Sequence, residues 1–214
     1  MQAHVWVDQK AVDRLAELDL SVAVIERVVR RAEAEVATCT PLDPPIMRGL
    51  TRWGRTTRFL REELIPLGWT YDNPRNLPRT IHPSRSFAIV ATAGDELTGV
   101  VELLPATKYP KGYATQLAVE ANEQLTLDFG DFDLQGADGT SLAPAGILTW
   151  ILLFHVREDG YQVELSLPDA MEGGRITNWA ERIILPLFPF APEPLQERRD
   201  DDGPDDIVVA VSRR

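Results

Sequence analysis

The sequence predicts an α+β protein in which N-terminal helices pack on a mainly antiparallel β-sheet, followed by a short C-terminal helix and a closing strand. Two observations lead to this prediction. Before about residue 66 the apolar residues recur at helical spacing, whereas from Phe87 onward they form short runs or alternate with polar residues. Because helices come first and strands follow, the order favours segregated α and β regions over alternating βαβ units.

The chain length is consistent with one globular domain spanning residues 1–214, with a helical part at about 1–66, a connecting loop at 67–85 and a sheet part at about 86–214. Hydrophobic residues make up 44% of the chain and charged residues 26%, which is ordinary for a globular protein that buries a core.

Three helices are expected in the first part. Lys10–Leu18 forms a short one, and a second begins at Ser21 and runs to about Thr38, where Pro41 follows. The second helix has one apolar stripe, made of Val22, Ile25, Val29, Ala32 and Val36.

The third helix is expected at about Thr51–Leu64. On a helical wheel its buried arc contains Leu50, Trp53, Thr57, Leu60 and Leu64. The opposite arc contains Arg48, Arg52, Arg55 and Phe59. The segment Gly68–Ser84 includes three residue-proline steps and is expected to be an irregular loop.

Strand patterns dominate the second part. Phe87–Ala91 and Thr98–Leu104 are expected strands around a turn, and Leu125–Phe129 alternates like a half-buried strand. The long apolar run Ile147–Val156 is typical of a central strand. It is followed by Glu158-Asp159-Gly160 and an alternating segment, Tyr161–Ser166, which together predict a hairpin.

The C-terminal region combines three different patterns. Thr177 can cap a short helix that contains Trp179 and Ile183. An acidic linker at 199–206 has too few apolar residues to pack in a core, and Ile207–Val211 is apolar enough to form the closing strand.

No leader or membrane segment is evident in the sequence. The first ten residues lack a basic region followed by an apolar run, and the longest apolar stretch is far shorter than the roughly 20 residues that cross a bilayer. The single cysteine, Cys39, excludes an internal disulfide. We therefore expect a cytoplasmic protein that does not bind membranes.

The charge is distributed unevenly along the chain. The formal net charge is −11, and residues 91–214 contain 9 basic and 22 acidic side chains, whereas residues 1–90 contain 13 and 11. Between Asp43 and Glu62 there are five arginines and no acid. Such asymmetry predicts which partners the surface attracts, and the acidic remainder argues against indiscriminate nucleic-acid binding.

The leading functional hypothesis is a non-catalytic binding or adaptor protein that docks an anionic partner through the arginine-bearing helix and the adjoining loop. The candidate partner-binding residues are Arg48, Arg52, Arg55, Arg58, Phe59, Trp69 and Arg79. A protein partner with an acidic surface and a nucleic acid both fit, because guanidinium groups pair with carboxylate or phosphate and an exposed aromatic ring can stack on a base. The arginines could equally be a solvated helix face or pair with acids of the same chain.

Two alternatives from other classes stay open. One is an enzyme with an acid–base site in the proline-punctuated loop, formed by His82 with Asp72 and Arg79. The other is a structural subunit in which the hairpin Ile147–Leu167 or the last strand extends a partner's sheet.

Neither a metal nor a cofactor is expected. Four acids between residues 128 and 138 could supply oxygen ligands, but the spacing lacks a calcium-loop pattern: Asp128, Asp131, Asp133 and Asp138. The three histidines are far apart in sequence, and no Walker lysine, dinucleotide fingerprint or Gly-x-Ser-x-Gly elbow occurs. No catalytic residue is assigned from the sequence.

Overall fold

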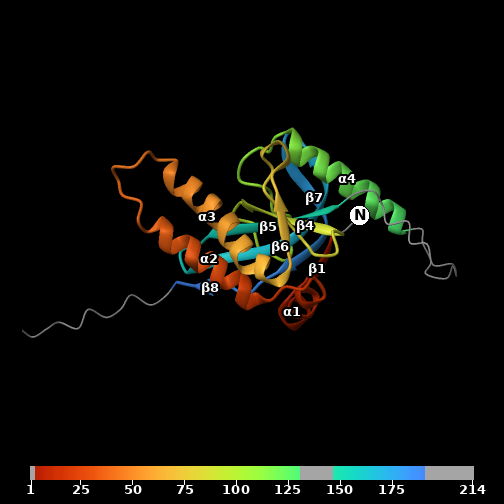
Figure 1. Cartoon of the computed structure of the whole chain (residues 1–214), viewed down its shortest axis with the longest axis horizontal. Coiled ribbons are helices and arrows are strands. Elements are labelled where there is room, and N and C mark those ends of the chain that lie inside the picture. The colour runs from red at the N-terminus through yellow and green to blue at the C-terminus, as the bar shows by residue number, and fades with distance from the viewer. Residues whose placement is uncertain (1–2, 131–146, 191–214) are drawn as a thin grey trace, which may run out of the picture.

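The computed structural model describes residues 3–130 and 147–190, which contain four α-helices and an eight-stranded sheet (Figure 1). The helices are α1 (Asp8–Glu17), α2 (Val22–Val36), α3 (Met47–Leu64) and α4 (Tyr113–Gly130). Two short 3-10 turns, η1 (Ile65–Leu67) and η2 (Pro74–Asn76), lie between α3 and α4 in the chain. The strands are β1 (His4–Trp6), β2 (Thr70–Asp72), β3 (Arg79–Ile81), β4 (Phe87–Ala93), β5 (Leu148–Val156), β6 (Gly160–Glu172), β7 (Arg175–Ile184) and β8 (Phe188–Pro189).

The strands are arranged in the order β1-β7-β6-β5-β4-β3-β2, and β8 pairs with β6 outside this path. The β1–β7 and β4–β5 pairs are parallel, and the other pairs are antiparallel. The expected α+β class with a mainly antiparallel sheet is confirmed. The parallel β4–β5 pair requires a crossover, which contains α4, so the helices are not confined to the N-terminal part.

Both faces of the sheet are covered. Along β5, Trp150, Leu152 and Phe154 join a core with α1, α2 and α3, whereas Ile151 and Leu153 join a second core with α4. Because residues 149–154 of the central strand are buried on one face or the other, the strand appears in the sequence as a mainly apolar run. The predicted central strand and its hairpin with β6 are both confirmed.

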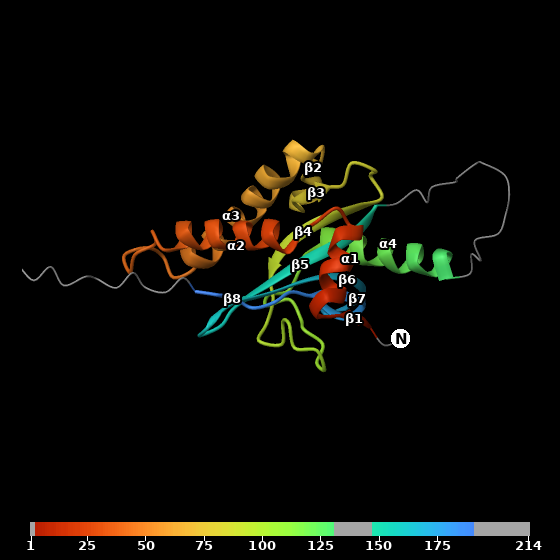
Figure 2. The same ribbon diagram turned by 90° about the horizontal axis from the view of Figure 1, so that it is seen from below.

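The first two predicted helices are also confirmed. The helix α2 begins where Ser21, in an extended conformation, accepts a hydrogen bond from the Val24 amide at 3.3 Å. This contact satisfies one of the amides that lack a partner in the first turn of a helix. Figures 1 and 2 show that α2 and α3 form a helical hairpin, and the loop that joins them lies at one end of the described molecule.

The predicted buried face of α3 is only partly correct. Leu60 and Leu64 are buried as expected, but Leu50 and Trp53 are 48% and 40% exposed, and Phe59, expected on the outer arc, is 5% exposed. The second half of α3 packs against α2 and β4, whereas its first turns leave large side chains in solvent. A helical wheel assumes one buried direction along the whole helix, which does not hold when a helix extends past its support.

The segment expected to be an irregular loop contains regular structure. Within residues 67–85, β2 and β3 form an antiparallel pair. Thr80 and Ile81 of β3 also pair with β4, which joins this hairpin to the sheet. The strands are only three residues long, so their sequences contain too few alternations to be recognised between prolines.

Two predicted strands are wrong. Leu125–Phe129 belongs to the C-terminal end of α4, because a five-residue alternation does not outweigh a helix that begins twelve residues upstream. Residues 98–104 form turns instead of a strand, and their peptide groups bond to side chains instead of another strand.

The predicted C-terminal helix around Thr177 is wrong as well, since residues 175–184 form β7. The register passes from Pro168↔Trp179 to Leu167↔Glu181 and skips Ala180, which is a β-bulge. The bulge places Trp179 on the second core and Ile183 on the first, so the apolar spacing does not show the period of two that identifies a regular strand. The closing strand at 207–211 and the acidic linker lie outside the described residues.

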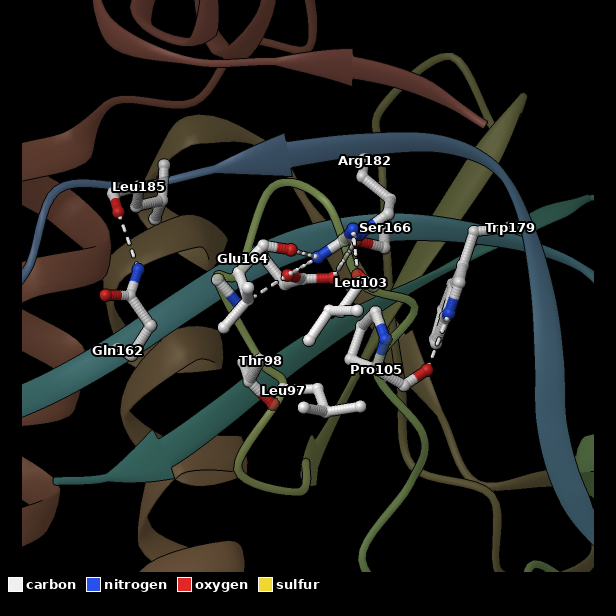
Figure 3. Close-up of polar contacts among 12 residues, drawn as sticks. Leu97, Thr98, Leu103, Pro105, Gln162, Glu164, Ser166, Trp179, Arg182 and Leu185 are labelled. Atoms are coloured by element: carbon white, nitrogen blue, oxygen red, sulfur yellow. Dashed lines mark hydrogen bonds and ion pairs between the residues drawn. The ribbon is translucent and has the colours of Figure 1, made fainter. Parts of the chain in front are cut away.

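A buried polar network fixes residues 94–107 against the second face of the sheet (Figure 3). Glu164 and Arg182, both 0% exposed, form an ion pair at 2.6 Å. Arg182 also donates to the Leu103 and Val100 carbonyls, at 2.7 and 3.2 Å, and Glu164 accepts from the Gly99 amide at 2.8 Å. The network supplies the hydrogen bonds that this segment does not make as a strand.

Gly54, within α3, allows a simple test of the helix. A Cβ added to Gly54 meets no atom within 4 Å, so Gly54→Ala should raise the free energy of unfolding by about 0.5–1 kcal/mol through helix propensity. Urea unfolding followed by circular dichroism measures this. Gly99→Ala is the opposite control and should lower the free energy of unfolding, because Gly99 has φ +79° and its Cβ would meet Gln162 at 2.2 Å. A Gly54→Ala protein no more stable than wild type would show that the middle of α3, around Gly54, is not helical in solution.

In the described ranges, no helix has both the length and the apolar character that crossing a membrane requires.

Candidate functional site at the tip of the α2–α3 hairpin

The structure places four of the predicted arginines along α3, and three of them pair with acids. Arg52 makes two 2.8 Å hydrogen bonds to Glu33 of α2, which raise the pKa of Arg52 above its usual value. Arg55 lies 3.3 Å from Glu35, and Arg58 lies 2.7 Å from Glu62 on the next turn.

Arg48 differs from the other arginines of α3. It is exposed, and no carboxylate of the described residues pairs with it. Arg55 is also half exposed, with 37% of its side chain accessible, and its partner Glu35 is 41% accessible. Since exposed pairs contribute little to stability, Arg55 can exchange its partner at small cost. The cationic character available to a partner is therefore concentrated at Arg48 and Arg55.

The two aromatic residues of the predicted site are buried. Phe59 lies under the guanidinium groups of Arg31 and Arg58, at 4.1 and 5.7 Å from its ring centre. Trp69 is 3% exposed and packs edge-on against Phe87. The expectation that these rings offer an open face for stacking is therefore wrong. Apolar burial of large rings outweighed the polar character of the neighbouring sequence.

Arg79 belongs to a different part of the surface. It pairs with Asp72 through bonds of 2.8 and 2.6 Å across β2 and β3, which lowers the pKa of Asp72. The same hairpin receives Arg61, which donates to the Asp72 and Arg79 carbonyls and to the Asn73 side chain. Desolvation lowers the pKa of Arg61. Arg79 thus closes the β2–β3 hairpin, and Arg61 ties the hairpin to α3.

The residues of the predicted acid–base site belong to two separate clusters. His82 contacts Asp19 at 2.9 Å through Nε2 and Ser84 at 2.7 Å through Nδ1, while Asp72 pairs with Arg79. The Ser84 amide also donates to His82 Nδ1, so that this nitrogen stabilises its own turn. The serine–histidine–aspartate contact therefore has a structural role, and the expected association of His82 with Asp72 and Arg79 is not formed.

The sheet-edge alternative is wrong for the hairpin. Both β5 and β6 lie inside the sheet, where each is paired on both sides. Among the described strands, β1 and β2 are the outer members of the path. The other candidate edge, residues 207–211, lies outside the described residues.

A group of exposed apolar side chains lies in the same segment of the chain as the two available arginines. We define the hairpin tip as the apolar residues Leu42, Ile46, Met47 and Leu50 together with Arg48 and Arg55. The apolar side chains are 97%, 65%, 36% and 48% exposed, in that order. Met47, Leu50 and Arg55 line a shallow groove of about 410 Å³ that passes over Gly54. Clustered exposure of this kind is unusual for a surface that has no partner.

The sequence reasoning missed these apolar residues. Leu42, Ile46 and Met47 stand between prolines and arginines, outside any periodic pattern. A signal was nevertheless present, since three large apolar residues, Leu42, Ile46 and Met47, occur in a proline-containing segment that was not assigned to any helix stripe. Leu50 was placed in the predicted buried arc of the third helix, so its exposure was not expected.

Within the described residues no group of three or more His, Cys, Asp or Glu side chains is arranged to hold a metal ion. The acid-rich segment considered above lies mainly at 131–146, outside the described residues.

Comparison of the chain with protein-family models, with curated proteins and with solved structures found no match.

Proposed function

We propose that this chain is a non-catalytic binding protein whose hairpin tip docks a partner protein surface bearing apolar side chains beside carboxylates. The observation that supports the proposal most directly is the exposure of Leu42 and Ile46 next to the unpaired Arg48. Covering such side chains contributes roughly 25 cal/mol per Å² of apolar area, so several together can offset a substantial part of the cost of association.

Charge gives the partner its orientation. The hairpin tip is cationic in a protein whose formal net charge is −11. An acidic partner surface is therefore attracted to Arg48 and Arg55 and repelled by the strongly acidic remainder. This selects the tip over other parts of the surface before any apolar contact forms.

A protein partner fits these observations better than a nucleic acid. Arg52 and Arg58 already pair with Glu33 and Glu62, which leaves few guanidinium groups for phosphates. The buried Phe59 provides no stacking surface for a base. The apolar groove between Met47 and Leu50 has no counterpart on a phosphate backbone.

Site-specific photo-crosslinking tests the proposal. A benzophenone amino acid is placed at Ile46 and, as a matched control, at Val12 of α1, which is 40% exposed and belongs to another surface. Ile46 should give one discrete adduct with a protein whose linked peptide contains acids beside apolar residues, and Val12 should not. An adduct removed by nuclease, an adduct with another copy of this chain only, or equal labelling at both positions would refute the proposal.

Substitutions then measure the contribution of each feature. With the cross-linked peptide as ligand in fluorescence anisotropy, Arg48→Glu and Leu50→Asp should each weaken binding by about tenfold or more, equivalent to 1.4 kcal/mol. Val12→Asp should change it less than twofold. Gly54→Leu fills the groove and should weaken binding, whereas Gly54→Ala should leave it nearly unchanged. Equal affinities for Leu50→Asp and Val12→Asp would contradict the assignment of the hairpin tip.

A further inference from the structure

A second candidate site, independent of the hairpin tip, lies at the open edge of β4. The strand β3 pairs with β4 only through Thr80 and Ile81, so no described strand lies beside the stretch of β4 from Val90 to Thr92 on that side. A cavity of about 170 Å³ lies here, and it is also lined by the segment before β3, by the start of α4 and by Trp53 of α3.

The lining of this cavity is apolar except for one cation and a few neutral polar groups. Its apolar lining includes Val90, Ile151 and Ile176. The polar members are Asn76, Thr92, Thr107, Thr115 and Lys111. The lining contains no carboxylate, which is unusual in a protein with 33 acids and only 22 basic residues.

Lys111 is the only charged residue of that lining. Its ammonium group donates to the Thr92 hydroxyl at 2.6 Å, and no ion pair to Lys111 forms among the described residues. Burial lowers its pKa, and desolvation is the sole cause, with no compensating charge. A protonated amine held this way lacks the counterion that buried charges normally have.

The edge of β4 adds a backbone donor. The Phe87 carbonyl accepts from the His82 amide, and the Ala93 carbonyl accepts from the Lys108 amide, so the odd-numbered residues of β4 direct their peptide groups toward this edge. Ala91 lies between them and lines the cavity. By the alternation of a β-strand, its amide points toward the same space.

We propose that this cavity binds a small organic carboxylate with a short apolar body, whose carboxylate pairs with the Lys111 ammonium and whose hydrocarbon part contacts Val90, Ile151 and Ile176. The volume limits the ligand, because a cavity of about 150 Å³ holds a molecule of the size of benzene. A single cation and neutral donors suit a monoanion better than a phosphate dianion, and the apolar walls favour a ligand with a hydrocarbon part.

The sign of the Lys111 shift gives the proposal a consequence for the free protein. Because the pKa of Lys111 is lower in the folded state, the unfolded state binds more protons between the folded and the unfolded pKa. Stability therefore rises with pH in that interval, and below it the partly desolvated charge destabilises the fold. Arg75 lines the adjoining cavity together with Tyr113, but the Lys111 shift arises from desolvation and not from Arg75. An anion that pairs with Lys111 removes this penalty, so a bound carboxylate stabilises the protein.

The test uses the full chain with acetate, propanoate, butanoate and benzoate as probes, each compared with its neutral amide and with inorganic phosphate. At least one carboxylate should give saturation-transfer NMR signals and raise the Tm by a few degrees, and its amide should do neither. Lys111→Met should itself raise the Tm. It should also weaken the affinity for the carboxylate at least tenfold. Lys108→Met, an exposed lysine three residues away, should respond as wild type.

Three outcomes would overturn the proposal. They are the absence of any response to all four carboxylates, an equal response to the amides, and a response in Lys111→Met equal to that of wild type. A response to phosphate alone would identify an adventitious inorganic anion and would also overturn it. Because Lys111→Met removes a destabilising charge, loss of folding is not expected, and Lys111→Gln is the second variant if the methionine protein aggregates. None of these results depends on the hairpin tip.

Discussion

Glu164→Ala should lower the free energy of unfolding by about 3–5 kcal/mol, because it leaves the Arg182 guanidinium without a counterion in the interior. Glu164 accepts four hydrogen bonds: two from Arg182, one from Ser166 and one from the Gly99 amide. When the carboxylate is removed, the Ser166 hydroxyl, the Gly99 amide and Arg182 Nε lose this acceptor, and Arg182 Nη2 keeps only the Val100 carbonyl. Urea unfolding followed by tryptophan fluorescence measures the loss.

Glu17→Ala is the matched control for this prediction. Glu17 also pairs with an arginine, Arg14, but 65% of its side chain is exposed, so the loss should be below about 1 kcal/mol. A Glu164→Ala protein with a loss as small as that of Glu17→Ala would show that the buried network does not stabilise the fold.

The double variant Glu164→Leu with Arg182→Met tests what the pair is for. Replacing a buried ion pair by apolar residues is often neutral or stabilising. Here it should remain destabilising, because the Val100 and Leu103 carbonyls lose the donor that Arg182 provides. Hydrogen exchange should show residues 94–107 opening more readily in this variant. Wild-type stability in the double variant would indicate that the segment is held by packing alone.

Trp179→Ala should cost about 3–5 kcal/mol, the range for truncating a large aromatic residue in a core. Trp179 is 0% exposed, contributes to the second core with Ile176 and Leu153, and donates from its indole nitrogen to the Pro105 carbonyl at 2.9 Å. Chemical unfolding with circular dichroism detection measures the loss.

Two further variants separate packing from hydrogen bonding at this position. Trp179→Phe keeps most of the ring volume and removes the donor, so it should cost less than Trp179→Ala but more than about 1 kcal/mol. Trp53→Ala, with 40% of the residue exposed, should cost much less than Trp179→Ala. Similar losses at Trp53 and Trp179 would contradict the description of the second core.

The contrast between α2 and β7 shows why some elements were predictable. In α2 a single stripe of five apolar residues and a serine cap specify a helix with one buried face, and no distant contact changes that result. In β7 a bulge at Ala180 reverses the facing of the strand, and the resulting apolar spacing resembles a helix. The position of the bulge depends on pairing with β6, which no local pattern shows.

The candidate sites illustrate the same difference. The excess of arginine in α3 is visible in the sequence, but the pairing of Arg52 with Glu33 joins residues of two helices. Lys111 gave no signal at all, because one lysine in a loop has no pattern. Its importance arises from desolvation by β4, α4 and Trp53, which are distant from one another along the chain.

The amino-acid order alone established the fold class, the first two helices, the central hairpin and the uneven charge, because each depends on neighbours within about a dozen residues or on composition. The tertiary structure decided which face of α3 is buried, which arginines remain available at Arg48 and Arg55, and where the cavity at Lys111 forms. Those properties depend on which side chains are removed from water and on which charges meet, and both are fixed only when segments far apart in the chain pack together.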